Sequence, residues 1–328
     1  MDKISPQISI VIAAKNEEKN ISGLLDSFKI IDYPANKFEI IIVDDNSTDN
    51  TLQEAMKYLN HFTNLRIIPA EDKKYPGKKG ALALGIMESH SDLIIITDAD
   101  CFVERDWLKS YIRKFNEGYD FLFGNAPFIE EPGFVNSIAR FENIRTFFLY
   151  RSALKIKLPY SAAARNFGFR KSSYERIKGY ENTTETLSGD DDLLIREAVK
   201  NKMRIGYVSD KESSVYSYAP ASFKEYLIQK TRHTKTSLYY LPIHKIMLAA
   251  WHIINLLCLF SFPLGLIDKW LFMPAVVKII TDIIIVEVNT READYKFRPF
   301  EIIYLQIIYE ALIVVNFVNA LFKGDKWK

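Results

Sequence analysis

Short apolar runs alternate with amphipathic stretches through the first hundred residues, and this alternation limits which folds the chain can adopt. In the apolar runs, hydrophobic residues occupy successive positions rather than every second one, which is typical of strands buried on both faces. Strands are predicted at residues 8–14, 38–45, 65–70 and 92–100, and helices at 21–30, 51–60 and 80–89. The sequence therefore predicts an α/β fold with a mostly parallel sheet that helices cover on both faces.

The pattern becomes less regular after residue 100. Helices are predicted at 105–116, 134–149, 191–200 and 222–239, and short strands at 121–125, 166–170 and 203–208. The stretch FKEYLIQKTRHTKTSLYY at residues 223–240 is basic, aromatic and amphipathic. One interpretation is an interfacial helix whose cations face lipid headgroups, which still leaves Gln229, Lys230 and Arg232 for a second role.

The last quarter of the chain is strongly apolar. Residues 246–267 form a 22-residue stretch without a formal charge, whereas residues 270–288 and 300–322 are apolar but interrupted by Lys278, Asp282 and a few glutamates. About 20 apolar residues in a helix cross a bilayer core, so the first stretch qualifies cleanly. We expect membrane helices here, in which Lys278 and Asp282 share a helix face and can pair; the alternative is a buried helical part of a soluble protein.

Composition excludes several classes of protein. The formal net charge of +2 over 328 residues argues against a nucleic-acid-binding protein, which would show a strong basic excess. Cys101 and Cys258 lie far apart, so they predict neither a disulfide framework nor a zinc site, and a reduced, cytosolic setting fits. The first residues lack the basic and apolar segments of a signal peptide, so none is expected.

Carboxylates follow two of the predicted strands. Asp98 and Asp100 end the run LIIITDAD, and Asp44 and Asp45 end the run FEIIIVDD. Because ligands of open α/β sheets bind beyond the carboxyl ends of the strands, we expect both pairs to line one crevice. Two carboxylates at positions i and i+2 can reach one hard cation, Mg²⁺ or Mn²⁺, whereas the structural alternative is a helix cap and a solvated loop acid.

Two further segments carry charged residues next to a helix start. YPGKKGALALG, at residues 75–85, combines glycines with Lys78 and Lys79, which suits a diphosphate although the motif alone is weak and is not a Walker A loop. TLSGDDDLLIRE, at residues 186–197, places Asp190, Asp191 and Asp192 together. Helix capping explains one of these acids well and three poorly, so one of them is a candidate general base with a raised pKa.

Taken in order, these segments resemble the family 2 glycosyltransferases. The resemblance extends from about residue 8 to about residue 233, and it depends on SIVIAAKNEE, VDDNSTDNT, GKKGALALG, TDAD, SGDDDLL and QKTRH. Each motif is weak alone, but six in this order and spacing are specific. The resemblance implies the Rossmann-like sheet of the A-type glycosyltransferase fold, followed by C-terminal transmembrane helices like those of membrane-bound, cellulose-synthase-like members.

The resemblance also implies roles for single residues on the donor side. The nucleotide would be held by Asp45, near the base, and by the turn after the first strand, represented by Ala14, Asn16 and Glu17. Lys78 or Lys79 would lie near the base and the diphosphate. Asp98 would lie nearer the ribose, and Asp100 would be the ligand of Mg²⁺ or Mn²⁺.

On the acceptor side, Asp191 matches the family's general base, with Asp190, Asp192 and His233 as further candidates near the acceptor. Gln229 and Arg232 match the Gln-x-x-Arg part of the Q-R-x-R-W motif of processive members, and would contact the donor. Two positions depart from that motif. Lys230 replaces an arginine and loses its bidentate fork, and His233 replaces a tryptophan that would form a platform for the acceptor sugar, which argues against processive synthesis.

The combined expectation is an inverting, metal-dependent glycosyltransferase with a nucleotide-sugar donor, UDP-sugars being favoured, and a lipid-linked or saccharide acceptor. Residues 1–242 would form a cytosolic catalytic domain, with a nucleotide-binding half at about 1–100 and an acceptor half at about 101–242. Residues 243–328 would form a multi-pass membrane region of about three helices in contact with membrane lipid, and no nucleic-acid partner is expected. Because no membrane span precedes the catalytic domain, a long translocation channel is not expected.

Three other classes of protein fit the sequence less well. A nucleotidyltransferase would have a glycine-rich phosphate loop directly after the first strand, and AAKNEEKN contains no glycine. A catalytically inactive, transferase-like membrane scaffold would lack some of the acids, yet every acidic position is filled. A dinucleotide oxidoreductase would need G-x-G-x-x-G, which this region lacks.

Overall fold

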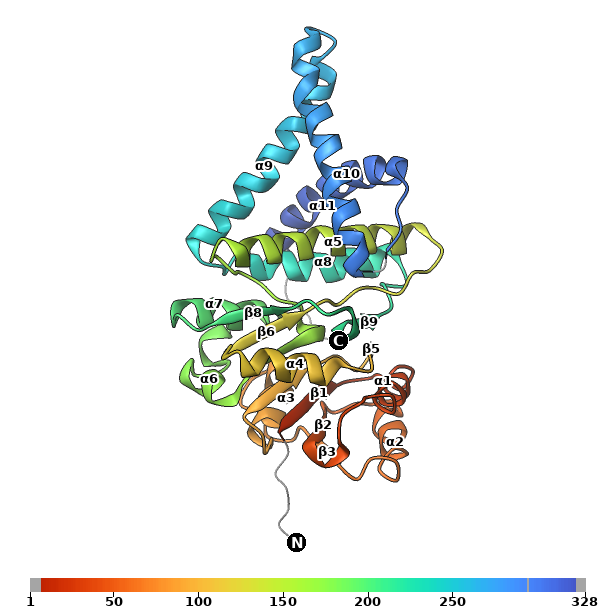
Figure 1. The fold of residues 1–328 in the computed structure, drawn as a ribbon, viewed down its shortest axis with the longest axis vertical. Helices are drawn as coiled ribbons and strands as arrows, with labels where there is room; N and C mark the ends of the chain where they lie inside the picture. The colour runs from red at the N-terminus through yellow and green to blue at the C-terminus, as the bar shows by residue number, and fades with distance from the viewer. Residues whose placement is uncertain (1–6, 294, 323–328) are drawn as a thin grey trace. The chain divides into compact units, whose positions relative to one another are not determined.

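The computed structural model describes residues 7–293 and 295–322, and these residues form two compact units. The first unit holds residues 7–127 and 159–218, and the second holds residues 128–158 and 219–322. The chain therefore leaves the first unit after its sixth strand and later returns to complete it (Figure 1). The predicted division at residue 242 concerns catalytic and membrane roles rather than packing, and it stays a prediction.

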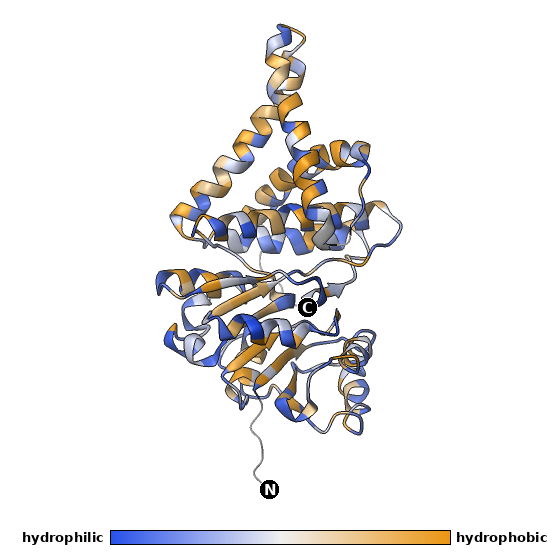
Figure 2. Ribbon diagram, viewed as in Figure 1, coloured by the Kyte–Doolittle hydropathy of each residue, from blue (hydrophilic) through white to orange (hydrophobic). Residues whose placement is uncertain are grey.

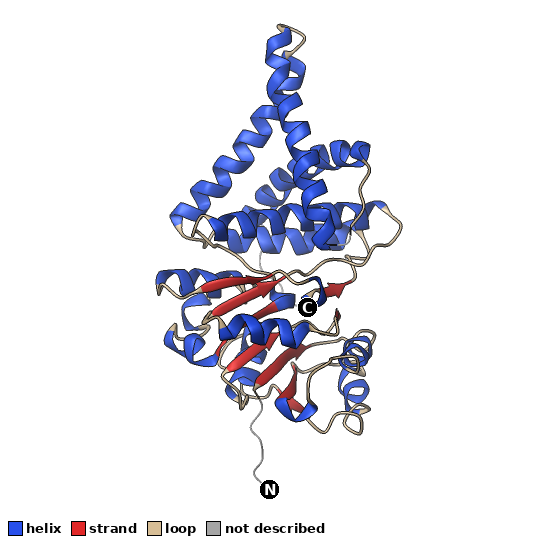
Figure 3. Ribbon diagram, viewed as in Figure 1, coloured by secondary structure: helices blue, strands red, loops and turns tan. Residues whose placement is uncertain are grey.

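A mostly parallel sheet forms the centre of the first unit, as predicted (Figure 3). Within the described residues its strand order is β3-β2-β1-β4-β7-β6-β8, and β7 runs antiparallel to its neighbours β4 and β6 while the other neighbours are parallel. The strands are β1 (Ile8–Ala14), β2 (Phe38–Asp44), β3 (Leu65–Pro69), β4 (Leu93–Ile96), β6 (Phe121–Gly124), β7 (Phe167–Arg170) and β8 (Ile205–Val208). The predicted strands are thus confirmed, with ends that shift by a few residues.

Helices cover the sheet because its strands are apolar on both faces. The helices of this unit are α1 (Ile21–Phe28), α2 (Thr51–Met56), α3 (Gly77–Met87), α4 (Trp107–Asn116), α6 (Lys171–Arg176) and α7 (Asp192–Lys200). Helix α3 approaches β1 and β2 so closely that a Cβ at Gly85 would lie 2.5 Å from Cγ1 of Val11. Only glycine allows this approach, which sets the position of the N-terminal turn of α3 above the sheet.

The fourth strand is shorter than predicted. β4 ends at Ile96, where its pairing with Val11 of β1 ends, so Asp98 and Asp100 belong to a turn rather than to the strand. The turn closes through a hydrogen bond from the N–H of Cys101 to the carbonyl oxygen of Asp98 at 3.2 Å. The chain then forms β5 (Cys101–Val103), which pairs antiparallel with β9 (Val215–Ser217), and the sequence did not predict this small sheet.

The second unit is built from helices. They are α5 (Phe134–Lys155), α8 (Phe223–Ser237), α9 (Pro242–Leu264), α10 (Met273–Ala293) and α11 (Pro299–Phe322), and the short 3-10 helix η5 (Lys269–Phe272) joins α9 to α10. A core that includes Phe141, Tyr226 and Tyr309 connects α5, α8 and α11. Figure 2 shows that apolar residues predominate along α9, α10 and α11.

Among the described helices, α9 and α11 are long and apolar enough to cross a membrane by length and composition. A core helix of a soluble protein meets the same criterion, so burial helps to separate the two cases. In the most apolar 18-residue stretch of α9 only 11% is buried inside the protein, compared with 39% in the corresponding stretch of α11. α10 does not meet the criterion, so composition alone supports two of the approximately three predicted membrane helices.

Candidate active site

The turn after β1 is held by the loop that follows β2. The backbone N–H of Asn16 donates to Oγ of Ser47 at 3.0 Å, and Oδ1 of Asn16 accepts the backbone N–H of Thr48 at 2.8 Å. The N–H of Glu17 donates to Oγ1 of Thr51 at 2.7 Å. Asn16 has a positive φ of 55°, a conformation that asparagine tolerates better than most residues. The predicted nucleotide turn is therefore fixed by the protein itself.

Asp45, the predicted partner of the base, is buried just past the end of β2. Its N–H donates to the carbonyl oxygen of Ala14 at 2.7 Å, and its Oδ1 pairs with Nζ of Lys73. Its Oδ2 is buried and has no hydrogen-bond partner among the described residues. A buried acceptor of this kind costs free energy until a donor reaches it, so Asp45 is suited to an N–H or O–H group of a ligand. The sequence did not single out Lys73.

Lys78 connects three of the segments that the sequence had singled out. Its Nζ lies 2.6 Å from Oδ1 of Asp98 and 2.7 Å from Oδ2 of Asp190, and only 9% of its side chain is exposed. Burial alone would lower the pKa of Lys78, but the charges of Asp190 and Asp98 outweigh it and raise this pKa above its usual value. Lys78 is therefore a permanent cation that joins the start of α3, the end of β4 and the loop before α7.

Lys79 has a different environment from its neighbour. It is 2% exposed, and its Nζ donates to the carbonyl oxygens of Thr183 and, at 3.0 Å, Thr186. Burial lowers the pKa of Lys79 to about 8, although Asp190 and other acids partly oppose the change. The sequence left open whether Lys78 or Lys79 lies near the base and the diphosphate. The structure places Lys78 between two acids and Lys79 against the backbone of residues 183–186.

Asp191 occupies the N-cap of α7 and accepts two backbone hydrogen bonds. Its Oδ1 accepts the N–H of Asp192 at 2.7 Å, and its Oδ2 accepts the N–H of Ala164 at 2.6 Å. Burial, followed by the nearby charges of Asp192 and Asp190, raises the pKa of Asp191 well above its ordinary value. A carboxylate with a raised pKa accepts a proton more readily, which is the property that a general base requires.

The two acids next to Asp191 have other partners. Burial would raise the pKa of Asp190, but the charge of Lys78 outweighs this effect and lowers it. Asp192 accepts a hydrogen bond from the hydroxyl of Ser161. The three adjacent acids therefore differ in environment. Asp190 pairs with Lys78, Asp191 caps α7 and has a raised pKa, and Asp192 accepts a hydrogen bond from a serine hydroxyl.

Asp98 and Asp100 are the residues that could hold a divalent cation. The thiol of Cys101 lies 3.6 Å from Oδ1 of Asp100, and 27% of the Asp98 side chain is exposed. The described residues contain no group of three or more histidine, cysteine or acidic side chains placed for a metal. A magnesium ion commonly takes one or two carboxylates and completes its coordination with substrate phosphates and water, so this pair of oxygen donors fits such an ion.

A buried asparagine, Asn166, holds the chain segment that contacts Asp191, and the sequence did not identify it. Asn166 is fully buried, and its Nδ2 donates to the carbonyl oxygens of Asn125 at 2.7 Å and Ser213 at 2.9 Å. Its Oδ1 accepts from Nε1 of Trp107 at 2.9 Å. Asn166 thereby holds the segment whose Ala164 N–H meets Asp191. Its only signal in the sequence is a single amide ahead of the apolar run FGF.

The remaining predicted donor residues lie on α8, in the second unit. Gln229 and Arg232 are three residues apart and share one side of the helix, with His233 next to it. Lys230 points to another side, where its Nζ lies 3.1 Å from Oε2 of Glu142. Glu142 also accepts from the hydroxyl of Tyr226 at 2.5 Å. The donor role of Gln229 and Arg232 and the acceptor role of His233 stay predictions.

Comparison with known proteins gives a consistent result. The sequence model of the glycosyl transferase family 2 matches residues 9–178. A protein of Methanococcus voltae named dolichyl N-acetyl-alpha-D-glucosaminyl phosphate 3-beta-D-2,3-diacetamido-2,3-dideoxy-beta-D-glucuronosyltransferase is 27% identical, over 97% of this chain and 98% of its own length. The beta-monoglucosyldiacylglycerol synthase of Synechocystis is 33% identical over 34% of this chain, and the matched part is 23% of that enzyme.

Solved structures resemble the chain over nearly its whole length. The mannosyltransferase PcManGT of Pyrobaculum calidifontis, in complex with GDP-Man and Mn²⁺, has a TM-score of 0.58 at 17% identity and covers 98% of this chain and 89% of its own. TarS 1–349 of Staphylococcus aureus, in complex with UDP-GlcNAc, has a TM-score of 0.51 at 19% identity, with coverages of 97% and 94%. Together they establish the A-type glycosyltransferase fold.

Proposed function

Because this chain belongs to glycosyl transferase family 2, it is a glycosyltransferase, and we propose that it transfers a sugar, with inversion, from a nucleotide-sugar donor to a lipid-linked or saccharide acceptor at a membrane. The observation that supports the proposal best is the placement of Lys78 between Asp98 and Asp190. This contact unites the three segments that have to act together on a donor: a helix N-terminus, a pair of strand-end acids and the acidic cluster.

The donor would bind across the ends of β1, β2 and β4. Asp45 has an unsatisfied buried oxygen for the base or the ribose, and Ala14, Asn16 and Glu17 form a turn that is fixed in advance. Lys78 and the N-terminus of α3 supply positive charge where a diphosphate is expected. Two structural relatives are complexes with UDP-GlcNAc and with GDP-Man, which supports a nucleotide-sugar donor, and UDP-sugars remain the favoured class.

A divalent cation, Mg²⁺ or Mn²⁺, would be held by Asp100 with Asp98 close by. When bound, it would supply positive charge against the negative charge that develops on the departing nucleoside diphosphate. The Mn²⁺ in the Pyrobaculum complex supports this part of the proposal.

Asp191 is proposed as the general base. It would take the proton of an acceptor hydroxyl while that oxygen forms a bond to the anomeric carbon. The bond from this carbon to the diphosphate breaks on the opposite side, and its electron pair leaves with the nucleoside diphosphate, so the configuration inverts. Two backbone N–H groups orient the Asp191 carboxylate for this role, while Asp190, Asp192 and His233 are candidates for contacts to the acceptor.

A lipid-linked acceptor and a membrane location fit the second unit. Its helices α9 and α11 are long and apolar enough to cross a bilayer, and the names of two relatives specify a dolichyl phosphate-linked sugar and a diacylglycerol product. We propose a multi-pass membrane protein with the site in the cytosol, in contact with membrane lipid. TarS, named as a poly(ribitol-phosphate) transferase, keeps a saccharide-type acceptor as the second possibility.

The test is a hydrolysis and transfer screen of the purified full chain. The protein is incubated with UDP- and GDP-sugars and Mn²⁺ or Mg²⁺, and released nucleoside diphosphate is measured. Parallel reactions contain UTP or GTP with a sugar 1-phosphate, and released pyrophosphate is measured. Release of nucleoside diphosphate from the sugar donors, lost in the Asp191→Asn variant, is the expected result. Release of pyrophosphate from the triphosphates would instead indicate a nucleotidyltransferase. No release from any donor, with or without detergent-solubilised lipid phosphate acceptors, would favour an inactive scaffold.

A further inference from the structure

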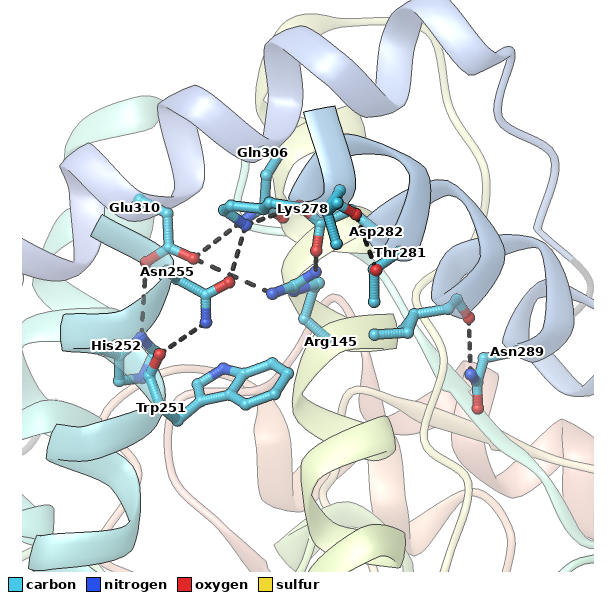
Figure 4. Close-up of polar contacts among 12 residues, drawn as sticks. Arg145, Trp251, His252, Asn255, Lys278, Thr281, Asp282, Asn289, Gln306 and Glu310 are labelled. Carbon is cyan, nitrogen blue, oxygen red and sulfur yellow. Dashed lines mark hydrogen bonds and ion pairs between the residues drawn. The ribbon is translucent and has the colours of Figure 1, made fainter. Parts of the chain in front are cut away.

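Buried charged side chains converge inside the second unit, where α5 meets α9, α10 and α11 (Figure 4). Nη1 of Arg145, on α5, donates to Oδ1 of Asp282 on α10 at 2.5 Å. Nζ of Lys278 donates to Oδ2 of Asp282 at 2.6 Å and to Oδ1 of Asn255, on α9, at 2.7 Å. The three charged residues are between 1% and 6% exposed. Their charges are therefore paired within the protein and hidden from its surface.

Helix α11 joins the same cluster through Glu310. Oε1 of Glu310 accepts from Nε2 of Gln306 at 2.7 Å and lies 3.9 Å from Nη2 of Arg145. Nδ1 of His252 on α9 lies 3.5 Å from Oε2 of Glu310 (Figure 4). Two cations thus face two carboxylates, so the cluster is balanced in charge without counting the histidine.

The two charged residues within the apolar part of α10 do not reach its exposed surface. Lys278 and Asp282 interrupt its apolar sequence, yet both point inward, and its exposed side carries Val277, Ile280 and Ile284. In a bilayer, a polar group needs a partner inside the protein because the hydrocarbon offers none. Judged by its exposed surface, α10 suits lipid as well as α9 does.

The exposed charges of the α9–α10 hairpin lie at its two ends. Lys245 and Glu287 are exposed at the base, and Asp268 and Lys269 at the turn between the helices. Residues 246–267 and 270–286, all described, expose no charged side chain between these points. At 1.5 Å per residue, the α-helical parts of the two stretches, 246–264 and 273–286, are about 28 and 21 Å long. The 3-10 residues 270–272 add about 6 Å to the second, so both lengths approach the roughly 30 Å of a bilayer core. Trp270, exposed beside Lys269, is typical of a membrane interface.

Helix α11 has a different neighbour. It packs along α8, and the side chains of Thr231 and Asn316 meet across the contact. α8 exposes Lys224 and Glu225, so a bilayer crossed by α11 would draw exposed charges of its neighbour into hydrocarbon. The exposed apolar side of α11 suits the boundary between headgroups and hydrocarbon instead.

We infer that the chain crosses the bilayer as the α9–α10 hairpin, and that α11, although it meets the composition criterion, lies at the interface beside α8. The inference rests on the proposed membrane location and assigns its spans. The buried cluster around Asp282 is the feature that allows α10 to lie in lipid.

Labelling of single cysteines in sealed vesicles tests the assignment. Cysteines are introduced in the full chain as Lys245→Cys, Lys269→Cys and Glu287→Cys, and a fourth is added after Lys328. Vesicles of both orientations are treated with a membrane-impermeant maleimide. The parent chain is the control, since Cys101 is buried and Cys258 lies within α9.

The expected result is labelling of positions 245, 287 and the added cysteine from one side, and of position 269 from the other. Labelling of 269 and 287 from the same side would mean that α10 does not cross, and labelling of the added cysteine opposite to 287 would mean that α11 does. Either result overturns the assignment while leaving the membrane location intact. Recovery of the parent chain in the soluble fraction after alkaline extraction would instead refute the membrane location itself.

Discussion

The two units of this protein both bury a lysine between acidic or polar partners, but they do so in different surroundings. In the first unit Lys78 bridges Asp98 and Asp190, whose side chains keep 27% and 13% of their surface exposed. In the second unit Lys278 and Arg145 share Asp282, which is 3% exposed. The first arrangement leaves carboxylate surface for a ligand, whereas the second hides the charges completely. The same residue types therefore form an open arrangement, for which we propose a role in donor binding, in one unit and a closed one in the other.

The largest expected effect comes from breaking the closed cluster. Asp282→Ala leaves Arg145 and Lys278 buried without their carboxylate, which should cost about 3–5 kcal/mol of stability. Thr281→Ala, at the exposed neighbouring position, is the matched control and should change stability by no more than about 0.5 kcal/mol. Thermal unfolding in detergent measures both variants. Equal behaviour of the two would show that the cluster does not hold the helices.

Asp191→Asn should act mainly on the reaction. Loss of a general base should lower the transfer rate by roughly 10²-fold or more, with donor affinity within a few-fold. Because an amide has one acceptor oxygen, the variant also loses one of the two backbone hydrogen bonds, which should cost about 1–3 kcal/mol of stability. Asp192→Asn, in which the amide oxygen can still accept from Ser161, is the control. A larger loss of rate in the control would mean that the wrong carboxylate was assigned.

Removal of the lysine in the open arrangement should weaken donor binding. Lys78→Met deletes a charge-assisted contact, worth about 1.5–3 kcal/mol, from the region where the diphosphate is expected. The affinity for UDP and GDP with Mn²⁺, measured by calorimetry, should fall accordingly, whereas Asp282→Leu combined with Arg145→Leu should leave it unchanged. If the double variant also bound UDP and GDP more weakly, the cluster around Asp282 would not be purely structural, as the comparison of the two units assumes.

Metal dependence gives a further test of the first unit. Asp100→Ala should keep the fold and lose most turnover, and EDTA should abolish the activity of the parent chain. An Asp100→Ala variant that keeps near-parental activity in EDTA would contradict the metal role.

The smallest expected effect is a pH dependence of stability from Lys79. Its pKa in the folded protein is about 8, below that of an unfolded lysine, so the unfolded chain binds more protons between these values. Stability therefore rises with pH in this range, by about 1 kcal/mol between pH 8 and pH 9. Lys79→Met should lack this rise. Parallel pH profiles of the two proteins would show that burial does not shift the pKa of Lys79.

The sequence predicted the parallel sheet because its strands are apolar on both faces, and β1 and β2 have the expected limits to within one residue. It also selected Lys78 and Asp98 for the donor side and Asp190 for the acceptor side, three residues whose side chains meet in the structure. The sequence did not predict features that depend on contacts between residues far apart in the chain. The end of β4 is set by its pairing with β1, the β5–β9 sheet joins segments more than a hundred residues apart, and Lys73 and Asn166 matter only through tertiary partners.

The place of β7 between β4 and β6 has a consequence for synthesis on the ribosome. β6 precedes α5 in the chain and β7 follows it, so the hydrogen-bonding edge of β4 has no neighbour on that side until residue 167 has been made. About 70 residues separate the end of β4 from this point, which corresponds to about 4–14 s at 5–20 residues per second. During this interval the nascent chain carries an open, isoleucine-rich strand edge, the kind of surface to which chaperones bind and at which aggregation begins.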